Sequence, residues 1–270
     1  MSRAKLITVV PYNPAWPMMY QKEASLIEKA LDNNLLAIHH IGSTSVPGLA
    51  AKPKIDILAV VRYPQQAITS LHKIGIEYRG EWNVPFKYGF AKRGDVDVNL
   101  HVFEKGNPEI ELNLLFCEYL SSHPNVRDTY AACKQSILQD ARSHYQQEGT
   151  MFATYTIKKA SFIRSVLRKA GFDRLRMLLC TDYVEWDSAE RLRKKYFTRV
   201  GIPPHPILRD KNHHHLILYK GVDIIGYAHV NAPDSQQRKL VMLLLDNPEY
   251  DNKYRCYFQE LIAKWMNLHR

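Results

Sequence analysis

The stretch HHIGSTSVPGLAAKPKIDILAVV, residues 39–61, decides the fold of the first half of this 270-residue chain. It joins a Gly-Ser turn and a Pro-Gly turn to the apolar run 55–61, which has the pattern of a buried strand. A glycine at position 42 lets the backbone approach a ligand closely. The N–H groups and the hydroxyl around Ser43 suit phosphate oxygens. This part of the sequence predicts a turn that binds phosphate.

Charged side chains follow the turn. Lys52 and Lys54 add positive charge that would neutralise phosphate. Asp56, at the start of the strand, is placed to hold Mg²⁺ beside a nucleotide. A P-loop is excluded, because Leu49 stands where the G-x-x-x-x-G-K-[ST] pattern requires lysine. The alternative is a tight turn at Pro47-Gly48 with Asp56 as a turn acceptor.

The second polar segment is GDVDVNLHVF, residues 94–103. A strand has a period of two, so one face would carry the four polar residues Asp95, Asp97, Asn99 and His101. We expect Asp97 or His101 to complete a site with Asp56, at an oxygen-to-oxygen separation of about 4–6 Å for a shared Mg²⁺. The alternative is an antiparallel strand with an ordinary solvent-facing side.

The segment from His40 to Ile57 resembles the GrpB family, whose pattern is close to E-H-I-G-S-T-[AS]-V-P-G-L-x-[AG]-K-P-x-I-D-I. The resemblance extends over residues 9–171 and includes VPYNPAWPMMYQKEA, VNLHVFEKG, YLSSHPNVRDTYAACKQ and YTIKKASFI. One departure is His39, where an acidic residue is usual. The family looks like a branch of the nucleotidyltransferase superfamily typified by polymerase beta. This resemblance implies a mixed sheet with flanking helices, a triphosphate on the Gly-Ser turn, and Mg²⁺ held by carboxylates.

The resemblance also implies roles for individual residues. Nucleotide or phosphate binding is expected of His40, Gly42, Ser43, Thr44, Lys52 and Lys54. Catalysis is expected of Asp56, Asp97 and His101, with Asp56 and Asp97 as metal ligands. The superfamily usually has two acidic residues separated by one apolar residue, whereas this chain has Asp56-Ile57-Leu58. Where the family has His-Leu-His, this chain has Asn99-Leu100-His101.

The second half has a different pattern. LILYKGVDIIGYAHV predicts a hairpin around Lys220-Gly221, and 239–246 predicts a buried strand before a helix that opens at Asn247-Pro248. Asp187 and Glu190 have capping-box spacing. The order resembles the GNAT acyltransferases from about Arg174 onward, which implies acyl-CoA as a cofactor. The glycines that would hold its pyrophosphate align with Asn252, Tyr254 and Cys256, and the chain ends before the last strand and helix of that fold.

Composition limits the remaining choices. The net charge of +10 suits polyanionic partners, but no nucleic-acid motif accompanies it. The sequence has no apolar run of about 18 residues and no signal-peptide pattern at its start, so we expect a cytoplasmic location without membrane association. Four scattered cysteines lack C-x-x-C spacing, and His213–His215 are expected at a loop and strand start rather than around a metal.

We therefore expect an α+β protein of two domains. Residues 1–171 would form a nucleotidyltransferase-like mixed sheet with flanking helices, and residues 172–270 a truncated GNAT-like domain. The expected function is binding of a nucleoside triphosphate or another phosphorylated small molecule with Mg²⁺, and transfer of a nucleotidyl group to an unknown acceptor. The alternatives are acyl transfer from acyl-CoA and a non-catalytic nucleotide- or CoA-binding module. The oligomeric state is left open.

Overall fold

The computed structural model describes residues 7–140, 154–234 and 237–268. By its internal contacts the chain divides into two compact units. Unit 1 comprises residues 1–82 and 86–172, and unit 2 comprises residues 83–85 and 173–270. Each unit is described by itself below.

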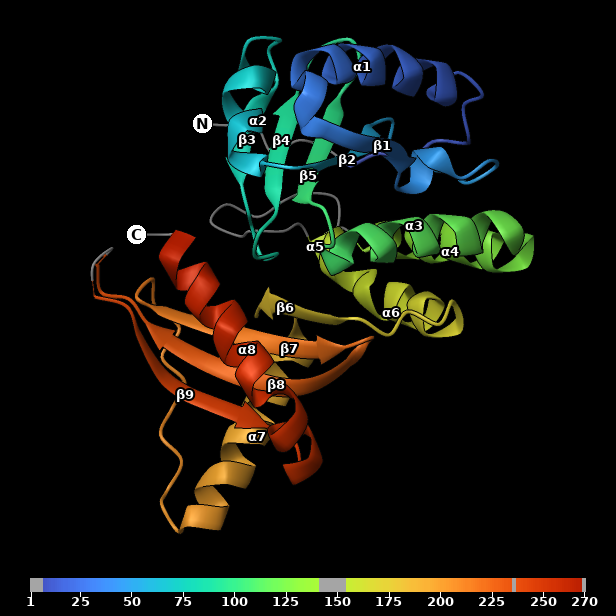
Figure 1. Ribbon diagram of the computed structural model, residues 1–270. Coiled ribbons are helices and arrows are strands. Elements are labelled where there is room, and N and C mark those ends of the chain that lie inside the picture. Colours follow the sequence, from blue (N-terminus) through green and yellow to red (C-terminus); the bar gives the residue numbers. More distant parts are fainter. Residues whose placement is uncertain (1–6, 141–153, 235–236, 269–270) are drawn as a thin grey trace, which may run out of the picture. The chain divides into compact units, whose positions relative to one another are not determined.

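Unit 1 is built on a five-stranded mixed sheet (Figure 1). Its strands are β1 (Leu35–Ile41), β2 (Ile55–Val61), β3 (Glu77–Gly80), β4 (Tyr88–Lys92) and β5 (Val98–Glu104). The order across the sheet is β1-β2-β5-β4-β3. Strands β2 and β5 are parallel, and the other neighbours are antiparallel. The predicted mixed sheet with flanking helices is therefore confirmed.

The helices of unit 1 lie on the two faces of this sheet. They are α1 (Trp16–Leu31), α2 (Pro64–His72), α3 (Pro108–Ser122), α4 (Pro124–Gln139), α5 (Thr154–Lys158) and α6 (Ala160–Lys169), with short 3-10 turns at Asp32–Asn34 and Ser43–Ser45. Figure 1 shows α3 to α6 gathered on the side of the sheet away from α1. Helix α3 contacts β1, and its Cys117 Sγ lies 3.8 Å from the carbonyl oxygen of Gly42.

Successive side chains of β2 point to opposite faces of the sheet, one facing the hydrophobic core and the other the polar site. Its odd-numbered residues are fully buried and pack with α1 and α2: Ile55, Ile57, Ala59 and Val61. Its even-numbered residues, which begin with Asp56, therefore point to the opposite face. On β5 the same register places Val98 and Leu100 in the core and Asn99 on the face of Asp56. The hydrophobic core thus fixes which side of the sheet carries the polar groups.

Unit 2 is a four-stranded antiparallel sheet with two long helices. Its elements are β6 (Leu175–Leu179), α7 (Tyr183–Val200), β7 (His213–Lys220), β8 (Asp223–Asn231), β9 (Lys239–Leu245) and α8 (Pro248–Leu268), and the sheet order is β6-β7-β8-β9. The hairpin predicted around Lys220-Gly221 is present as β7 and β8.

Several local predictions are corrected by the structure. From Asn13 and Pro14 the sequence predicts a helix that starts at Pro14, but helix α1 begins at Trp16, and Asn13 Oδ1 accepts a hydrogen bond from the N–H of Ala15. The capping box of α7 is formed by Asp182 and Glu185, not by the predicted pair five residues later. Strand β9 is only partly buried, because it lies at the edge of its sheet.

The remaining features concern membranes and thiols. Among the described residues, no helix is both long and apolar enough to cross a membrane. All four cysteines are free, and Cys256 is exposed.

Candidate functional site

The centre of the site is the carboxylate of Asp56 beneath the backbone of Gly42. Gly42 has φ +71°, and a Cβ at this position would lie 2.6 Å from Asp56 Oδ2. The preceding residue, Ile41, pairs with Asp56 across β1 and β2, which brings the turn directly over the carboxylate. A residue with a side chain would therefore be strained in its backbone and would also collide with Asp56. Glycine is required at this point of the motif.

The turn is locked by contacts inside the motif. Thr44 is buried, and its hydroxyl donates to the carbonyl oxygen of Lys54 over 3.2 Å. His40 Nε2 lies 3.1 Å from the same hydroxyl, and its ring stacks on Tyr20 with centroids 4.7 Å apart. Burial lowers the pKa of His40 to about 4, so this imidazole is neutral at pH 7. His40 and Thr44, both predicted to bind the ligand, are engaged in holding the turn.

Strand β5 provides the partner of Asp56. Asn99 lies opposite Asp56 in the parallel register, and its Nδ2 donates to Asp56 Oδ1 over 2.8 Å. Arg93 Nη2 donates to Asn99 Oδ1 over 2.9 Å, which fixes the orientation of the amide. Burial raises the pKa of Asp56, while the hydrogen bond from Asn99 and the charge of nearby lysines oppose this rise.

The other polar residues of this segment lie in different positions. Strand β5 begins at Val98, so Asp95 and Asp97 precede it, and Asp95 is exposed. The carbonyl oxygen of Asp97 accepts a hydrogen bond from the N–H of Ile55 over 2.9 Å. Ile55 immediately precedes Asp56, so the backbone of Asp97 lies close to that residue. His101 lies on the same face as Asp56, opposite Leu58. Burial lowers the pKa of His101 far below its usual value, and the charge of Lys87 adds to this effect.

Four largely buried lysines, Lys52, Lys87, Lys134 and Lys159, lie in this part of unit 1. The charges of Lys52 and Lys159 lower the pKa of Asp56, as does that of Lys54. The ammonium groups of Lys52 and Lys159 lie over the same ring, that of Tyr155, at 4.3 and 4.6 Å from its centroid. The Lys87 ammonium lies 4.2 Å from the centroid of the Trp82 ring, and the residue is only 5% exposed. Within the described chain, the ammonium groups of Lys52, Lys87 and Lys159 form no hydrogen bond or ion pair.

The fourth lysine, Lys134, belongs to helix α4, which clamps the motif loop. Arg127 Nη1 donates to the carbonyl oxygen of Pro47 over 3.0 Å. Two helical turns later, Lys134 Nζ donates to the carbonyl oxygen of Ala50 and lies 3.3 Å from Ser43 Oγ. Lys134 is 1% exposed. This helix therefore fixes the loop at both ends and delivers an ammonium group to the predicted phosphate-binding serine.

The lysines titrate at unusually low pH. Burial, followed by repulsion from neighbouring lysines, lowers the pKa of Lys52 to about 8 and that of Lys134 to about 7. Burial also lowers the pKa of Lys87 to about 8 and lowers that of Lys159. Repulsion by Lys159 contributes to the low pKa of both Lys52 and Lys134. Negative charge opposes the effect of burial elsewhere: Asp56 favours the charged form of Lys159, and Glu109 with Asp56 favours that of Lys87. An anionic ligand would relieve the repulsion between the lysines.

The donor set does not suit a metal ion held by protein groups alone. In the described part of the chain, no three His, Cys, Asp or Glu side chains are grouped so as to hold a metal. Asp56 is next to an amide rather than a second carboxylate, and lysines surround it. Mg²⁺ prefers six oxygen ligands, so an ion here would need most of them from a ligand's phosphates.

Sequence reasoning identified the motif residues but missed the lysines that come from other elements. Lys87, Lys134 and Lys159 are distant in sequence from residues 39–61. The signal that would have found two of them lies in the GrpB resemblance, since YLSSHPNVRDTYAACKQ contains Lys134 and YTIKKASFI contains Lys159. Lys87 lies outside the quoted segments and has no comparable signal.

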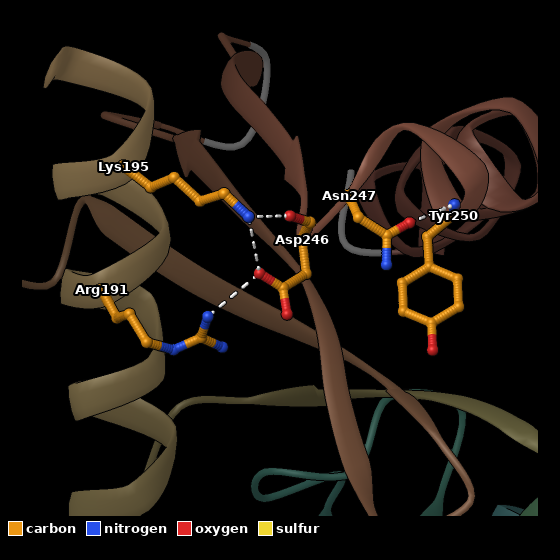
Figure 2. A network of polar contacts seen from close by, with 5 residues as sticks. All are labelled: Arg191, Lys195, Asp246, Asn247 and Tyr250. Atoms are coloured by element: carbon orange, nitrogen blue, oxygen red, sulfur yellow. Dashed lines mark hydrogen bonds and ion pairs between the residues drawn. The ribbon is translucent and has the colours of Figure 1, made fainter. Parts of the chain in front are cut away.

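In unit 2, acidic groups occupy the helix start where acyl-CoA is expected. Figure 2 shows Asp246, at the end of β9, held by Arg191 and Lys195 of α7, and Asn247 capping α8 through the N–H of Tyr250. The first turn of α8 carries Glu249 and Asp251. These carboxylates would repel a pyrophosphate at the helix N-terminus. Acyl-CoA binding stays a prediction.

Comparisons with known proteins agree with the motif. UPF0157 protein BH1888 of Halalkalibacterium halodurans is 37% identical over 168 residues, which are 61% of this chain and 83% of that protein. UPF0157 protein YqkA of Bacillus subtilis is 36% identical over 135 residues, which are 48% of this chain but only 39% of YqkA. The crystal structure of GrpB from Enterococcus faecalis aligns with a TM-score of 0.53 and 30% identity, over 60% of this chain and 96% of that one.

A more distant neighbour is terminal uridylyl transferase 4 from Trypanosoma brucei with bound dUTP, which covers 60% of this chain and 56% of its own at 12% identity and a TM-score of 0.42. The family described as GrpB protein matches residues 6–169 of this chain. That span contains the motif turn, the central strands and the lysine-bearing helices, and the chain therefore belongs to the GrpB family.

Proposed function

We propose that unit 1 binds a nucleoside triphosphate, with the phosphates between the Gly42-Ser43 turn and the ammonium groups of Lys52, Lys134 and Lys159. The observation that carries this proposal is the set of desolvated lysines beside the motif: Lys52 and Lys159 share the ring of Tyr155 and act on Asp56, and Lys134 reaches Ser43. A triphosphate carries enough negative charge to satisfy several ammonium groups at once. The family's resemblance to nucleotidyltransferases makes the nucleoside triphosphate the preferred polyanion.

The proposed role of Mg²⁺ follows from the single carboxylate. The ion would enter with the triphosphate, take most of its ligands from phosphate and water, and use Asp56 as its protein ligand. Asp97 is the second predicted ligand, and its position just before β5 keeps it in this proposal. When bound, the ion would neutralise charge on the phosphates. The chain's own residues orient Asp56 through Asn99 and Arg93.

Nucleotidyl transfer is the finer form of the proposal. The acceptor's oxygen or nitrogen would attack the α-phosphorus, and pyrophosphate would leave toward the lysines. His101 lies on the same face as Asp56, which keeps it as the proposed proton acceptor. Burial and Lys87 make its imidazole a weak base in the free protein, so the negative charge of the bound triphosphate would have to raise its pKa for this role. The presence of Asn99, where a second carboxylate would strengthen metal binding, favours a module that binds without turnover as the second candidate.

Isothermal titration calorimetry with ATP, GTP, CTP and UTP, with and without Mg²⁺, tests binding. Lys134→Gln is expected to weaken binding at least tenfold, whereas Lys73→Gln, the same charge change at an exposed position of unit 1, is expected to leave it unchanged. Binding of no triphosphate by the unmodified protein, or equal effects of the two variants, would refute the proposal.

Asp56→Asn tests the metal separately. If Asp56 meets the triphosphate through Mg²⁺, the variant should weaken binding in the presence of Mg²⁺. In its absence the variant should strengthen binding, because a repelling charge has been removed. The same direction of change under both conditions would exclude the metal role. Release of pyrophosphate on mixing with a triphosphate and candidate acceptors separates transfer from binding alone.

A further inference from the structure

Unit 2 contains a cleft of about 660 Å³ between helix α7 and the loop that follows it. This volume is in the range of small-molecule sites. Pro204, Pro206 and Ile207 form an apolar part of its lining, and Arg193 and Arg209 contribute guanidinium groups. Concave apolar surface next to convergent cations is suited to an organic anion.

Arg193 is the unusual residue of the cleft. It is 7% exposed, and its Nη2 donates to the carbonyl oxygen of His205 over 2.8 Å. Its Nη1 lies 3.8 Å from Met242 Sδ, and its Cζ lies 5.4 Å from the ring centroid of Phe197. No carboxylate of the described chain forms an ion pair with it. A guanidinium cannot lose its proton, so this charge stays buried without a counter-ion from the described residues.

Two other arginines of the cleft are paired with carboxylates, while Asp187 and Lys194 line it at exposed positions. Arg209 pairs with Glu190 over 2.9 Å and lies 4.1 Å from the ring centroid of Trp186. Arg191 is bound to Asp246 (Figure 2). Among the described residues that line the cleft, Arg193 is therefore a buried cation without an ion-pair partner.

The histidines behind Arg193 add no negative charge. His215 and His229 stack with centroids 4.7 Å apart, and His213 Nδ1 lies 2.7 Å from His229 Nε2. Burial lowers the pKa of His229 to about 4 and also lowers that of His215, and Arg193 contributes to both shifts. Asp210 lies 3.7 Å from His213 Nε2 and is exposed. The cleft itself is lined by two exposed carboxylates, Asp187 and Glu190, against four cations, Arg191, Arg193, Lys194 and Arg209. The lining therefore has a net positive charge.

We propose that the cleft binds a small organic anion, with its carboxylate or phosphate on Arg193 and its apolar body against Pro204, Pro206 and Ile207. The inference concerns unit 2 alone and does not depend on triphosphate binding by unit 1. Arg193 would meet the anion, and Arg209 would extend the contact along the cleft.

Trp186 provides a local reporter for the test. The chain contains four tryptophans, so the full-length protein labelled with 5-fluorotryptophan should give four ¹⁹F resonances, and Trp186→Phe assigns the relevant one. Titration with sodium benzoate and with phenyl phosphate, at ionic strength matched with NaCl, should shift the Trp186 resonance. Benzamide, which has the same shape without the charge, should not. The relative response to the two anions distinguishes a carboxylate site from a phosphate site.

Two variants decide the role of Arg193. Arg193→Met is expected to weaken the response to the anions at least tenfold, while Arg199→Met, the same change at an exposed position of the same helix, should retain it. Arg193→Met should not lower the melting temperature without ligand, because it removes an uncompensated buried charge. A residue that only fastens the loop would instead lower the melting temperature when replaced and leave the anion response intact.

The proposal is overturned if benzamide shifts Trp186 as much as benzoate does, if neither anion shifts it, or if Arg193→Met responds like the unmodified protein. Should Arg193→Met fail to fold, Arg193→Lys keeps the charge but loses the planar fork. It should then weaken the response several-fold. An unchanged response in Arg193→Lys would also count against the site.

Discussion

Gly42 shows how one residue without a side chain makes the site. Gly75 also has a positive φ, but nothing lies within 4 Å of a Cβ built at Gly75, whereas a Cβ at Gly42 would meet Asp56. Substitution of Gly75 therefore measures backbone strain alone, and substitution of Gly42 measures backbone strain together with a steric clash.

Gly42→Ala and Gly75→Ala should each lose about 1 kcal/mol of unfolding free energy through backbone strain. Gly42→Ala should lose at least about 1 kcal/mol more from the clash with Asp56, and it alone should abolish triphosphate binding. Urea denaturation and calorimetry provide the two readouts. Equal losses, with binding kept in both variants, would show that the turn tolerates a side chain at residue 42.

The low pKa values of the lysines make binding depend on protons. Near pH 8, much of Lys134 and about half of Lys52 are neutral in the free protein, because their pKa values are about 7 and 8. A bound triphosphate favours the charged forms and so raises both pKa values. Binding should then take up protons.

Affinity for the triphosphate should accordingly rise as the pH falls from 9 to 7.5. At pH 8, the calorimetric enthalpy should differ between buffers of high and low ionisation enthalpy, in the direction of proton uptake. Lys134→Arg keeps its charge throughout this range and should take up fewer protons. Proton release on binding by the unmodified protein would contradict the assignment.

At the level of single residues, prediction succeeded where the site is contiguous in sequence. Gly42, Ser43, Lys52 and Asp56 lie within fifteen positions, and the fold brings Lys134 to Ser43 from 91 residues away. No local pattern marks Lys134 as a site residue, because a lysine in a helix is ordinarily a solvated group. Only packing of α4 against the motif loop turns it inward.

Among the elements, helix α7 shows why boundaries are harder to predict than existence. Asp182 and Asp187 are both followed three residues later by glutamate, and both fit the capping-box pattern. The structure uses the first pair. Asp182 Oδ1 accepts from the N–H of Glu185, and Glu185 Oε2 accepts from the N–H of Asp182. The hydroxyl of Tyr219 adds a tertiary hydrogen bond to Glu185, which no local pattern contains.

Asp182→Ala should lower the free energy of unfolding by about 1–2 kcal/mol, because it removes the buried cap of a long helix that packs one face on the sheet. Asp187→Ala, at an exposed position inside the same helix, should change it by no more than about 0.5 kcal/mol. Urea denaturation followed by tryptophan fluorescence measures both. If the two variants lose equal stability, the capping assignment is wrong.

Alternation predicted the faces of the strands better than their ends. The segment around Asn99 does alternate polar and apolar residues, but β5 begins at Val98, so the two aspartates before it are not strand residues. The parallel pairing with β2 decides this, since the register sets Ile55 against Val98. A partner 43 residues earlier in the chain cannot be read from the segment itself.

For the whole molecule, the order of patterns predicted the mixed sheet with flanking helices in the first half, whereas the GNAT-like fold of the second half stays a prediction and the assignment of residues 83–85 to unit 2 could not be read from the sequence. The two halves meet near Phe172, and residues 83–85 from the first half cluster with the second. Asn83 Nδ2 donates to Thr181 Oγ1 over 3.3 Å, which ties this short segment to unit 2. Neither composition nor hydrophobic periodicity indicates that these three residues belong to unit 2.

This division predicts an asymmetry between fragments. A fragment of residues 1–172 should keep triphosphate affinity within about threefold of the full chain, because every described group of the site lies within it. A fragment of residues 173–270 should melt at a lower temperature than unit 2 does in the full chain, since it lacks residues 83–85. Calorimetry and thermal melts test both. A first fragment that folds but has lost its affinity would place part of the site outside it.

The parallel pairing of β2 with β5 has a consequence for the order of folding. Loops that join distant strands close slowly, and contacts of large sequence separation form late. Asp56 meets Asn99 only after this pairing, and Lys134 and Lys159 follow later still in the chain. Refolding experiments should therefore show hairpin and helix signals before any ability to bind a triphosphate. Binding competence would appear with the slowest phase, which makes the ligand a kinetic probe of complete assembly of unit 1.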